Sequence, residues 1–292
     1  MKGGNGLILF GKEVKVKNYG CSCDPDYIIS PVKPRLNLYI QSQEKCNACC
    51  DICNPGCIST RFDYEKLKSV LSELEGSGLT SKVSVTGGEP LMDMERTTMI
   101  ARMLNEFRFH TALNTNAYDT GRLTDAYGLF DTVYISRHHY DNDMNDEIMG
   151  IRTPCISMLS RHDTEGKIII NCVLQKGYID SADKIKEYME HIGMTGIRKI
   201  RFISPYGLTP AAERKMIPVE PIIEEFMKNT NSGVLYDRHN CSCLDFMYVT
   251  SAGTVVNGVI KNNMTCRFDC CRQLVYNGEY LYDGFEKRQV II

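Results

Sequence analysis

Four cysteines lie within eight residues in the stretch Cys46-Asn47-Ala48-Cys49-Cys50-Asp51-Ile52-Cys53, which constrains this chain more than any other feature. Thiolates bind zinc or iron–sulfur clusters, and their spacing indicates which. The spacing Cys46-x3-Cys50-x2-Cys53 supplies one ligand fewer than a closed [4Fe–4S] cluster takes, which would leave one iron open to a substrate or cofactor. Taken as Cys46-x2-Cys49 or Cys50-x2-Cys53, the stretch is half of a zinc knuckle that needs a second cysteine pair elsewhere. The stretch alone leaves both interpretations open.

A second motif follows one strand–helix unit downstream, where Lys82-Val83-Ser84-Val85-Thr86 runs into Gly87-Gly88-Glu89-Pro90. Together the two motifs resemble the radical S-adenosylmethionine (SAM) superfamily, in which three cysteines follow the first barrel strand and a GGEP segment follows the second. The resemblance implies a [4Fe–4S] cluster on Cys46, Cys50 and Cys53, reductive cleavage of SAM to a 5′-deoxyadenosyl radical, and hydrogen abstraction from a substrate carbon. It also implies that the glycine pair contacts the methionine amine of SAM, since residues without Cβ permit close approach. The alternative is a turn that uses these residues only to end a strand.

The composition indicates a globular protein. The 292 residues, 43% of them hydrophobic, are enough for one large α/β barrel or two ordinary domains. A net charge of −2 gives no electrostatic indication of binding to nucleic acid or to a membrane surface. No long apolar run is present and the N-terminal apolar stretch is too short for a signal peptide, so we expect a cytoplasmic protein without nucleic-acid or membrane partners. Fourteen cysteines then favour metal or redox chemistry over disulfides.

Strand and helix patterns predict an α/β fold, a partial (βα)6 TIM-like barrel over residues 35–217, between an N-terminal hairpin or lid in 1–34 and a small cysteine-rich, β-containing extension in 218–292. In the first barrel helix, Asp63 is the expected N-cap and Gly76 the expected end. In the second, Met99 is expected to face the core. The expected strands cover 36–41, 82–86, 111–115, 131–136, 167–174 and 198–203, the expected helices 63–76, 94–107, 123–129, 182–191 (closed by Gly193) and 219–228, and the expected hairpin 7–18.

Further polar residues follow the later strands, at the face where such barrels carry active sites. Asn114-Thr115-Asn116 is similar to the Thr-Asn-Gly that ends the third strand of many radical SAM enzymes, with Ala117 in place of Gly. The cofactor contacts that the resemblance implies are Ile52, Gly87, Gly88, Glu89, Pro90, Thr115, Asn116, Ser136, Arg137, Asn171 and Ile203.

The segment Val133-Tyr134-Ile135-Ser136 resembles the branch that holds the GTP cyclase of molybdenum-cofactor biosynthesis and the SPASM/twitch peptide-modifying enzymes. His138 stands where that branch carries Asp. We expect His138 to contact substrate or handle protons, with a core or solvated histidine as the alternative. Adjacent strand residues point to opposite sides, so at most one of His138 and His139 would face the site. The expected catalytic residues are Cys46, Cys50, Cys53 and His138.

The C-terminal region carries five more cysteines. The spacing between Cys243 and Gly253 resembles the start of the twitch extension, which holds an auxiliary cluster in relatives. The next ligand position of that pattern falls on Gly258. Cys243 and Cys270 are the expected metal ligands there. A second iron–sulfur cluster, a zinc staple and idle thiols all stay open. The further candidate ligands are Cys241, Cys266 and Cys271.

The favoured function is modification of a ribosomally made peptide by a SAM-derived radical, with electrons from an external one-electron reductant such as flavodoxin or ferredoxin. One alternative is a small-molecule or nucleotide substrate in cofactor biosynthesis. Another is a glycyl-radical activase. The non-enzymatic alternative, a zinc-stapled interaction module, leaves the GGEP motif unexplained.

Overall fold

The computed structural model describes residues 6–15, 36–53, 58–205, 209–229, 235–237, 243–262, 272–285 and 289–292. An 11-stranded sheet organises this part of the chain, in the order β13-β12-β3-β4-β5-β6-β7-β8-β11-β10-β9. The strands from β12 to β11 in this order are all parallel, and only the outer strands pair antiparallel. The strands are β3 (Leu36–Gln41), β4 (Thr80–Thr86), β5 (His110–Thr115), β6 (Thr132–Ser136), β7 (Ile168–Val173), β8 (Lys199–Ile203), β9 (Leu235–Asp237), β10 (Leu244–Val249), β11 (Val255–Lys261), β12 (Arg272–Tyr276) and β13 (Leu281–Asp283).

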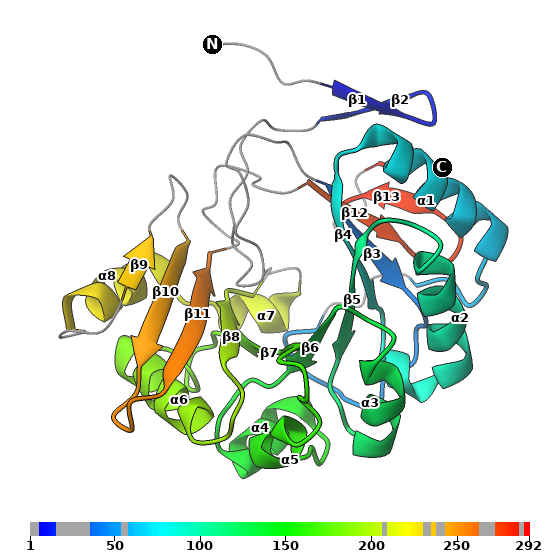
Figure 1. Cartoon of the computed structure of the whole chain (residues 1–292). Coiled ribbons are helices and arrows are strands. Elements are labelled where there is room, and N and C mark those ends of the chain that lie inside the picture. Colours follow the sequence, from blue (N-terminus) through cyan, green and yellow to red (C-terminus); the bar gives the residue numbers. More distant parts are fainter. Residues whose placement is uncertain are drawn as a thin grey trace.

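The sheet curves into an open barrel, with α1 to α6 and α8 around its convex side (Figure 1). This confirms the predicted partial TIM-like barrel: β3 to β8 are the six expected strands, and β11 and β12 continue the parallel run at its two ends. The helices are α1 (Tyr64–Ser77), α2 (Met94–Leu104), α3 (Thr120–Tyr127), α4 (Asn142–Met149), α5 (Ile156–Ser160), α6 (Ala182–Gly193), α7 (Pro210–Arg214) and α8 (Val219–Asn229), with a 3-10 turn η1 (Pro90–Met92).

The core lies between the outer face of the sheet and the helices. Alternate strand residues such as Leu38, Val83 and Ile170 are 0% exposed and join one apolar cluster with the buried stripes of the helices. The residues between them face the inside of the barrel, and many are polar. In a closed TIM barrel the interior is filled with branched apolar side chains. The interior of this barrel is therefore more polar than that of a closed TIM barrel.

Two local predictions on the helices are wrong. The Asp63 side chain caps α1 as expected, by accepting from the Lys66 amide. However, α1 passes through Gly76 and ends at Gly78, whose left-handed φ of 64° favours glycine. Met99 is 45% exposed rather than buried, because the face of α2 that packs on the sheet carries Thr97, Ile100, Ala101 and Leu104.

The N-terminal hairpin is confirmed over residues 6–15. β1 (Gly6–Leu9) pairs antiparallel with β2 (Lys12–Lys15), and the turn residues Phe10 and Gly11 both have positive φ, as a type I′ turn requires. Its role as a lid and the division at residues 34 and 217 stay predictions, as does the cytoplasmic location. No helix in the described ranges is both long enough and apolar enough to cross a membrane.

Candidate functional site

The cysteine loop leaves the carboxyl end of β3 and brings its thiols together. Cys46, Cys50 and Cys53 form no disulfide. Burial raises the pKa of all three thiols, and the neighbouring thiols of Cys53 and Cys46 help to raise the pKa of Cys50 to about 12. Such repulsion acts over short distances, so the three side chains share one region. A bound metal stabilises thiolates and reverses this shift, so the donor set fits a metal cluster.

Among the described residues, no group of three His, Cys, Asp or Glu side chains surrounds the position of a single metal ion. The ligand roles of Cys46, Cys50 and Cys53 therefore stay predictions, and they rest on the motif and on the proximity of the thiols.

Cys49 is exposed, as are Cys46 and Cys53 in the same loop, so it is not a small hydrophobic residue of the core. Its amide donates to the Met149 carbonyl at 2.9 Å. A Cβ on Gly150 would lie 2.1 Å from the Cys49 sulfur. Cys49 thus anchors the loop on the C-terminus of α4.

The GGEP loop packs directly on the cysteine loop. The Gly88 amide donates to the Gln43 carbonyl at 2.7 Å, and the Glu89 amide donates to the Lys45 carbonyl at 2.8 Å. A Cβ on Gly88 would lie 1.9 Å from the Lys45 oxygen, and one on Gly87 2.6 Å from the Gln43 oxygen. These contacts require glycine whether or not a ligand is present. The SAM contact of Gly87, Gly88 and Pro90 stays a prediction.

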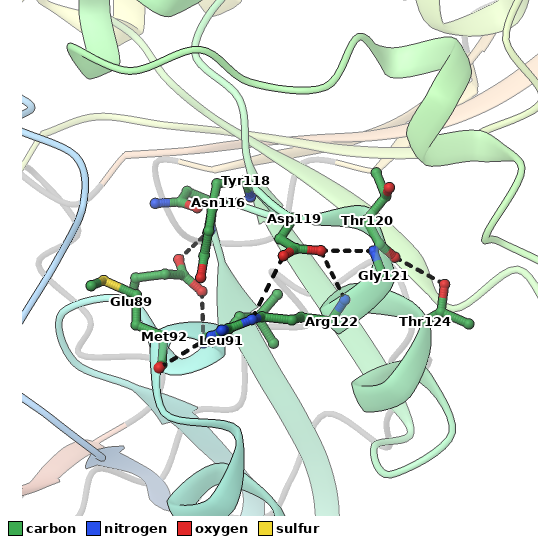
Figure 2. A network of polar contacts seen from close by, with 10 residues as sticks. All are labelled: Glu89, Leu91, Met92, Asn116, Tyr118, Asp119, Thr120, Gly121, Arg122 and Thr124. Atoms are coloured by element: carbon green, nitrogen blue, oxygen red, sulfur yellow. Dashed lines mark hydrogen bonds and ion pairs between the residues drawn. The ribbon is translucent and has the colours of Figure 1, made fainter.

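Glu89 joins the GGEP loop to the end of β5. Its carboxylate accepts from the Leu91 amide at 2.9 Å and the Asn116 amide at 2.7 Å (Figure 2). It also accepts from the Thr115 hydroxyl at 2.5 Å. Burial raises the pKa of Glu89, and these hydrogen bonds oppose that rise. Because both oxygens already accept protein donors, we assign Glu89 a positioning role in this structure.

Glu89→Gln is expected to lower the free energy of unfolding by about 2 kcal/mol. The NH2 group that replaces one carboxylate oxygen is a donor, so it cannot accept the hydrogen bonds which that oxygen accepted. Urea denaturation measures this change. Glu95→Gln, at an exposed position in the first turn of α2, is the matched control and is expected to cost no more than roughly 0.5 kcal/mol. Equal losses in the two variants would contradict the positioning role.

The end of β5 also reaches the cysteine loop. The Asn116 side-chain amide donates to Asn47 Oδ1 at 2.8 Å, so the loops after β3, β4 and β5 form one connected unit. Ala117, where relatives carry Gly, has a φ of 53°, a left-handed conformation that strains alanine. The cofactor contacts of Thr115 and Asn116 stay predictions.

Arg137 points away from this unit. Its guanidinium donates to the Pro154 carbonyl and to Asn142 Oδ1, both at 2.9 Å, in the segment around α4. Strand alternation alone did not reveal this, because Arg137 lies just past the end of β6. These contacts give no support to the predicted cofactor role of Arg137. Ser136 lies opposite Asn171 in the β6–β7 register, at the barrel mouth.

Both adjacent histidines are buried, His138 at 6% and His139 at 8% exposure. His138 Nδ1 accepts from the Val173 amide at 3.2 Å, and His139 Nδ1 accepts from the Asp141 amide at 3.0 Å. Burial, followed by the charge of Arg137, lowers the pKa of His138 to about 4. His138 is therefore a neutral core histidine in this structure, and its catalytic role stays a prediction.

The depressed pKa of His138 predicts acid sensitivity. Between about pH 6.5 and pH 4 the unfolded chain binds a proton that the folded chain does not. The free energy of unfolding is therefore expected to decrease by on the order of 3 kcal/mol as the pH is lowered through this range. Urea titrations across this window test it. His138→Gln is expected to flatten the dependence while His162→Gln retains it, and an unchanged slope in His138→Gln would contradict the assignment.

In the C-terminal region only Cys243 can be placed. It is buried, at 2% exposure, directly before β10. Gly258 lies opposite Phe246, where a Cβ would meet the ring at 2.2 Å, so packing explains the glycine at the expected ligand position. The metal role of Cys243 stays a prediction. Cys241, Cys266, Cys270 and Cys271 lie outside the described residues.

Sequence reasoning missed Gln43, Asn47 and Arg201. The Gln43 side chain donates to the Glu89 carbonyl, Asn47 pairs with Asn116, and Arg201 Nε donates to Asn171 Oδ1 at 3.0 Å. None of these three pairings has a local sequence signal.

No protein-family model matches the chain. The 4-hydroxyphenylacetate decarboxylase activating enzyme of Clostridioides difficile is 24% identical over 126 residues, which cover 41% of this chain and 40% of that protein. The matched residues thus span less than half the length of this curated relative.

Solved structures match over more of the chain. SuiB of Streptococcus suis bound to its precursor peptide SuiA has a TM-score of 0.60 and 16% identity, covering 85% of this chain and 58% of SuiB. The fold is that of the radical SAM enzymes. SuiB bound to S-adenosylmethionine matches with a TM-score of 0.55 and 20% identity, covering 66% of this chain and 46% of that chain. The radical SAM fold places the cysteine loop after its first strand, as it is here after β3.

Proposed function

We propose that the chain is a radical SAM enzyme that abstracts hydrogen from a residue of a polypeptide. The observation that carries this proposal is the connected unit of the β3, β4 and β5 loops, which holds the three cysteines at the carboxyl face of an open parallel barrel. Cys46, Cys50 and Cys53 would hold a [4Fe–4S] cluster. That cluster would supply the electron that cleaves SAM.

The residues of the chain supply positioning. The hydrogen bonds of Gln43, Lys45 and Asn47 to the neighbouring loops fix the cysteine loop against β4 and β5. The contacts that the radical SAM resemblance implies for the cofactor are Ile52, Gly87, Gly88, Glu89, Pro90, Thr115, Asn116, Ser136, Arg137, Asn171 and Ile203, and for Glu89 and Arg137 the structure supports positioning roles instead. The barrel wall would exclude water from the reacting atoms.

A polypeptide substrate is supported by the open sheet and by the relatives. Among the described strands, β11 pairs with β8 and β10, and β12 pairs with β3 and β13. The two strands do not pair with each other, so the barrel is open between them. An extended chain can enter a barrel that is open along one side. SuiB was solved with a precursor peptide, and an anSMEcpe structure with a bound peptide matches with a TM-score of 0.50 and 17% identity, covering 67% of this chain and 58% of that one.

Glycyl-radical activation is the second candidate, because the matched Clostridioides difficile protein is an activating enzyme. Its substrate would also be a polypeptide, as part of a folded partner protein. A small-molecule substrate in cofactor biosynthesis is the third. The external reductant, flavodoxin or ferredoxin, remains a proposal for all of them.

Deuterium transfer distinguishes these candidates. The reduced, SAM-loaded protein is incubated with fractions of fully deuterated cells of the organism that makes it: peptides, intact proteins and small metabolites. We expect 5′-deoxyadenosine to gain deuterium from the peptide fraction. Transfer from intact proteins alone would favour the activase, and transfer from metabolites alone would contradict a polypeptide substrate.

A further inference from the structure

The middle of the cysteine loop rests on elements that follow the later barrel strands. The Cys49 amide donates to the Met149 carbonyl at the end of α4. Two residues further along the loop, the Asp51 carboxylate pairs with Lys215 Nζ at 3.1 Å, and Lys215 is the residue that ends α7. Because α4 follows β6 and α7 follows β8, the loop that leaves β3 is held from both sides of the barrel mouth.

Lys215 is itself held by the loop that follows β7. Its carbonyl accepts from the Lys176 amide at 3.0 Å. Its Nζ lies 5.4 Å from the centre of the Tyr178 ring. The Tyr178 hydroxyl donates to Glu147 Oε1 on α4 at 3.0 Å. These contacts keep the ammonium group beside Asp51 and leave the Lys215 side chain 25% exposed.

The partner of Lys215 occupies a sensitive position in the loop. Asp51 is the only acidic or basic side chain besides the thiols in the stretch 46–53, and it lies between Cys50 and Cys53, two of the three predicted ligands. The net charge around an iron–sulfur cluster helps to set its reduction potential. A negative charge nearby opposes the uptake of an electron, and a positive charge favours it. The charge of Lys215 therefore offsets the charge of Asp51 where it matters for reduction.

We propose that Lys215 is a positioning residue that raises the reduction potential of the cluster through its ion pair with Asp51. This inference rests on the radical SAM function proposed above, in which the cluster must accept one electron before SAM is cleaved. The ammonium group holds the middle of the loop and neutralises the carboxylate between two ligands. An exposed ion pair contributes little to folding, so the effect lies in the potential rather than in stability.

A redox titration followed by electron paramagnetic resonance tests the proposal without turnover. The reconstituted protein is poised at a series of potentials with dithionite and mediator dyes, and the reduced-cluster signal is recorded at each. At a fixed potential, Lys215→Gln is expected to lower the ratio of reduced to oxidised cluster by about fivefold, and Asp51→Asn to raise it by about the same factor. The double variant removes both charges and is expected to return close to the wild-type ratio.

Two further variants serve as controls. Lys215→Arg keeps the positive charge and is expected to keep the wild-type ratio. Lys68→Gln breaks an exposed ion pair with Glu106 at 2.8 Å, far along the chain from the cysteine loop, and is expected to leave the ratio unchanged.

The outcomes separate this inference from the proposed function. An unchanged ratio in Lys215→Gln, with the cluster signal intact, overturns the inference and leaves the radical SAM function standing. Shifts in the same direction in both single variants, without a return in the double variant, would mean that the ion pair only holds the loop, and they overturn the inference as well. If the wild-type protein takes up no cluster, the proposed function fails and the inference fails with it.

Discussion

Replacement of Cys46, Cys50 or Cys53 by alanine is expected to abolish both cluster assembly and SAM cleavage. The Cys46 thiol is close enough to help raise the pKa of both Cys50 and Cys53, and a site that leaves one iron open has no spare ligand. Iron and sulfide content and 5′-deoxyadenosine formation, measured after anaerobic reconstitution, give the result.

Cys49→Ala is the matched control within the same loop. Its sulfur contacts Gly150 at the end of α4, and its amide bond to Met149 does not depend on the side chain. We expect this variant to keep most of its iron and most of its SAM cleavage. If Cys49→Ala lost the cluster while Cys50→Ala kept it, the ligand assignment would be wrong.

Gly88→Ala is expected to have the second-largest effect. The added Cβ would lie 1.9 Å from the Lys45 carbonyl oxygen, a backbone atom that cannot rotate away. The cysteine loop must then move, and we expect a loss of roughly 3 kcal/mol in the free energy of unfolding together with a loss of bound iron. Urea denaturation and iron content measure the two effects.

Gly76→Ala is the control for this substitution. Gly76 lies inside α1 with no atom within 4 Å of a built Cβ, so alanine is expected to stabilise the protein by about 0.5–1 kcal/mol. A Gly88→Ala variant that kept its stability and its iron would show that the contact between the two loops does not require glycine.

The barrel was predictable from sequence because the alternation of apolar residues and the sequence motifs indicate the same strands. The alternation in 36–41 and 82–86 places apolar residues on the outer face, and a cysteine loop and a GGEP turn follow these strands directly. The end of α1 was missed by two residues, since Gly76 and Gly78 are equivalent until the backbone shows which has positive φ.

The site was less predictable because its contacts join distant segments. The motif residues Gly88 and Glu89 were found, but their contacts with Lys45 and Asn116 depend on how neighbouring strands place their loops. Arg137 follows a strand like the other rim residues, and only tertiary packing directs it to Pro154. Pairing of β11 and β12 with opposite ends of the barrel likewise has no local signal.

The electron paramagnetic resonance spectrum of the reconstituted, reduced protein, recorded with and without SAM, tests the central claim most directly. About four irons and four sulfides per chain are expected for the cluster on Cys46, Cys50 and Cys53, and about eight of each if the C-terminal cysteines hold a second one. We predict a reduced-cluster signal that changes shape when SAM binds the open iron. Bound zinc without sulfide, or a cluster signal that SAM leaves unchanged, would contradict the account.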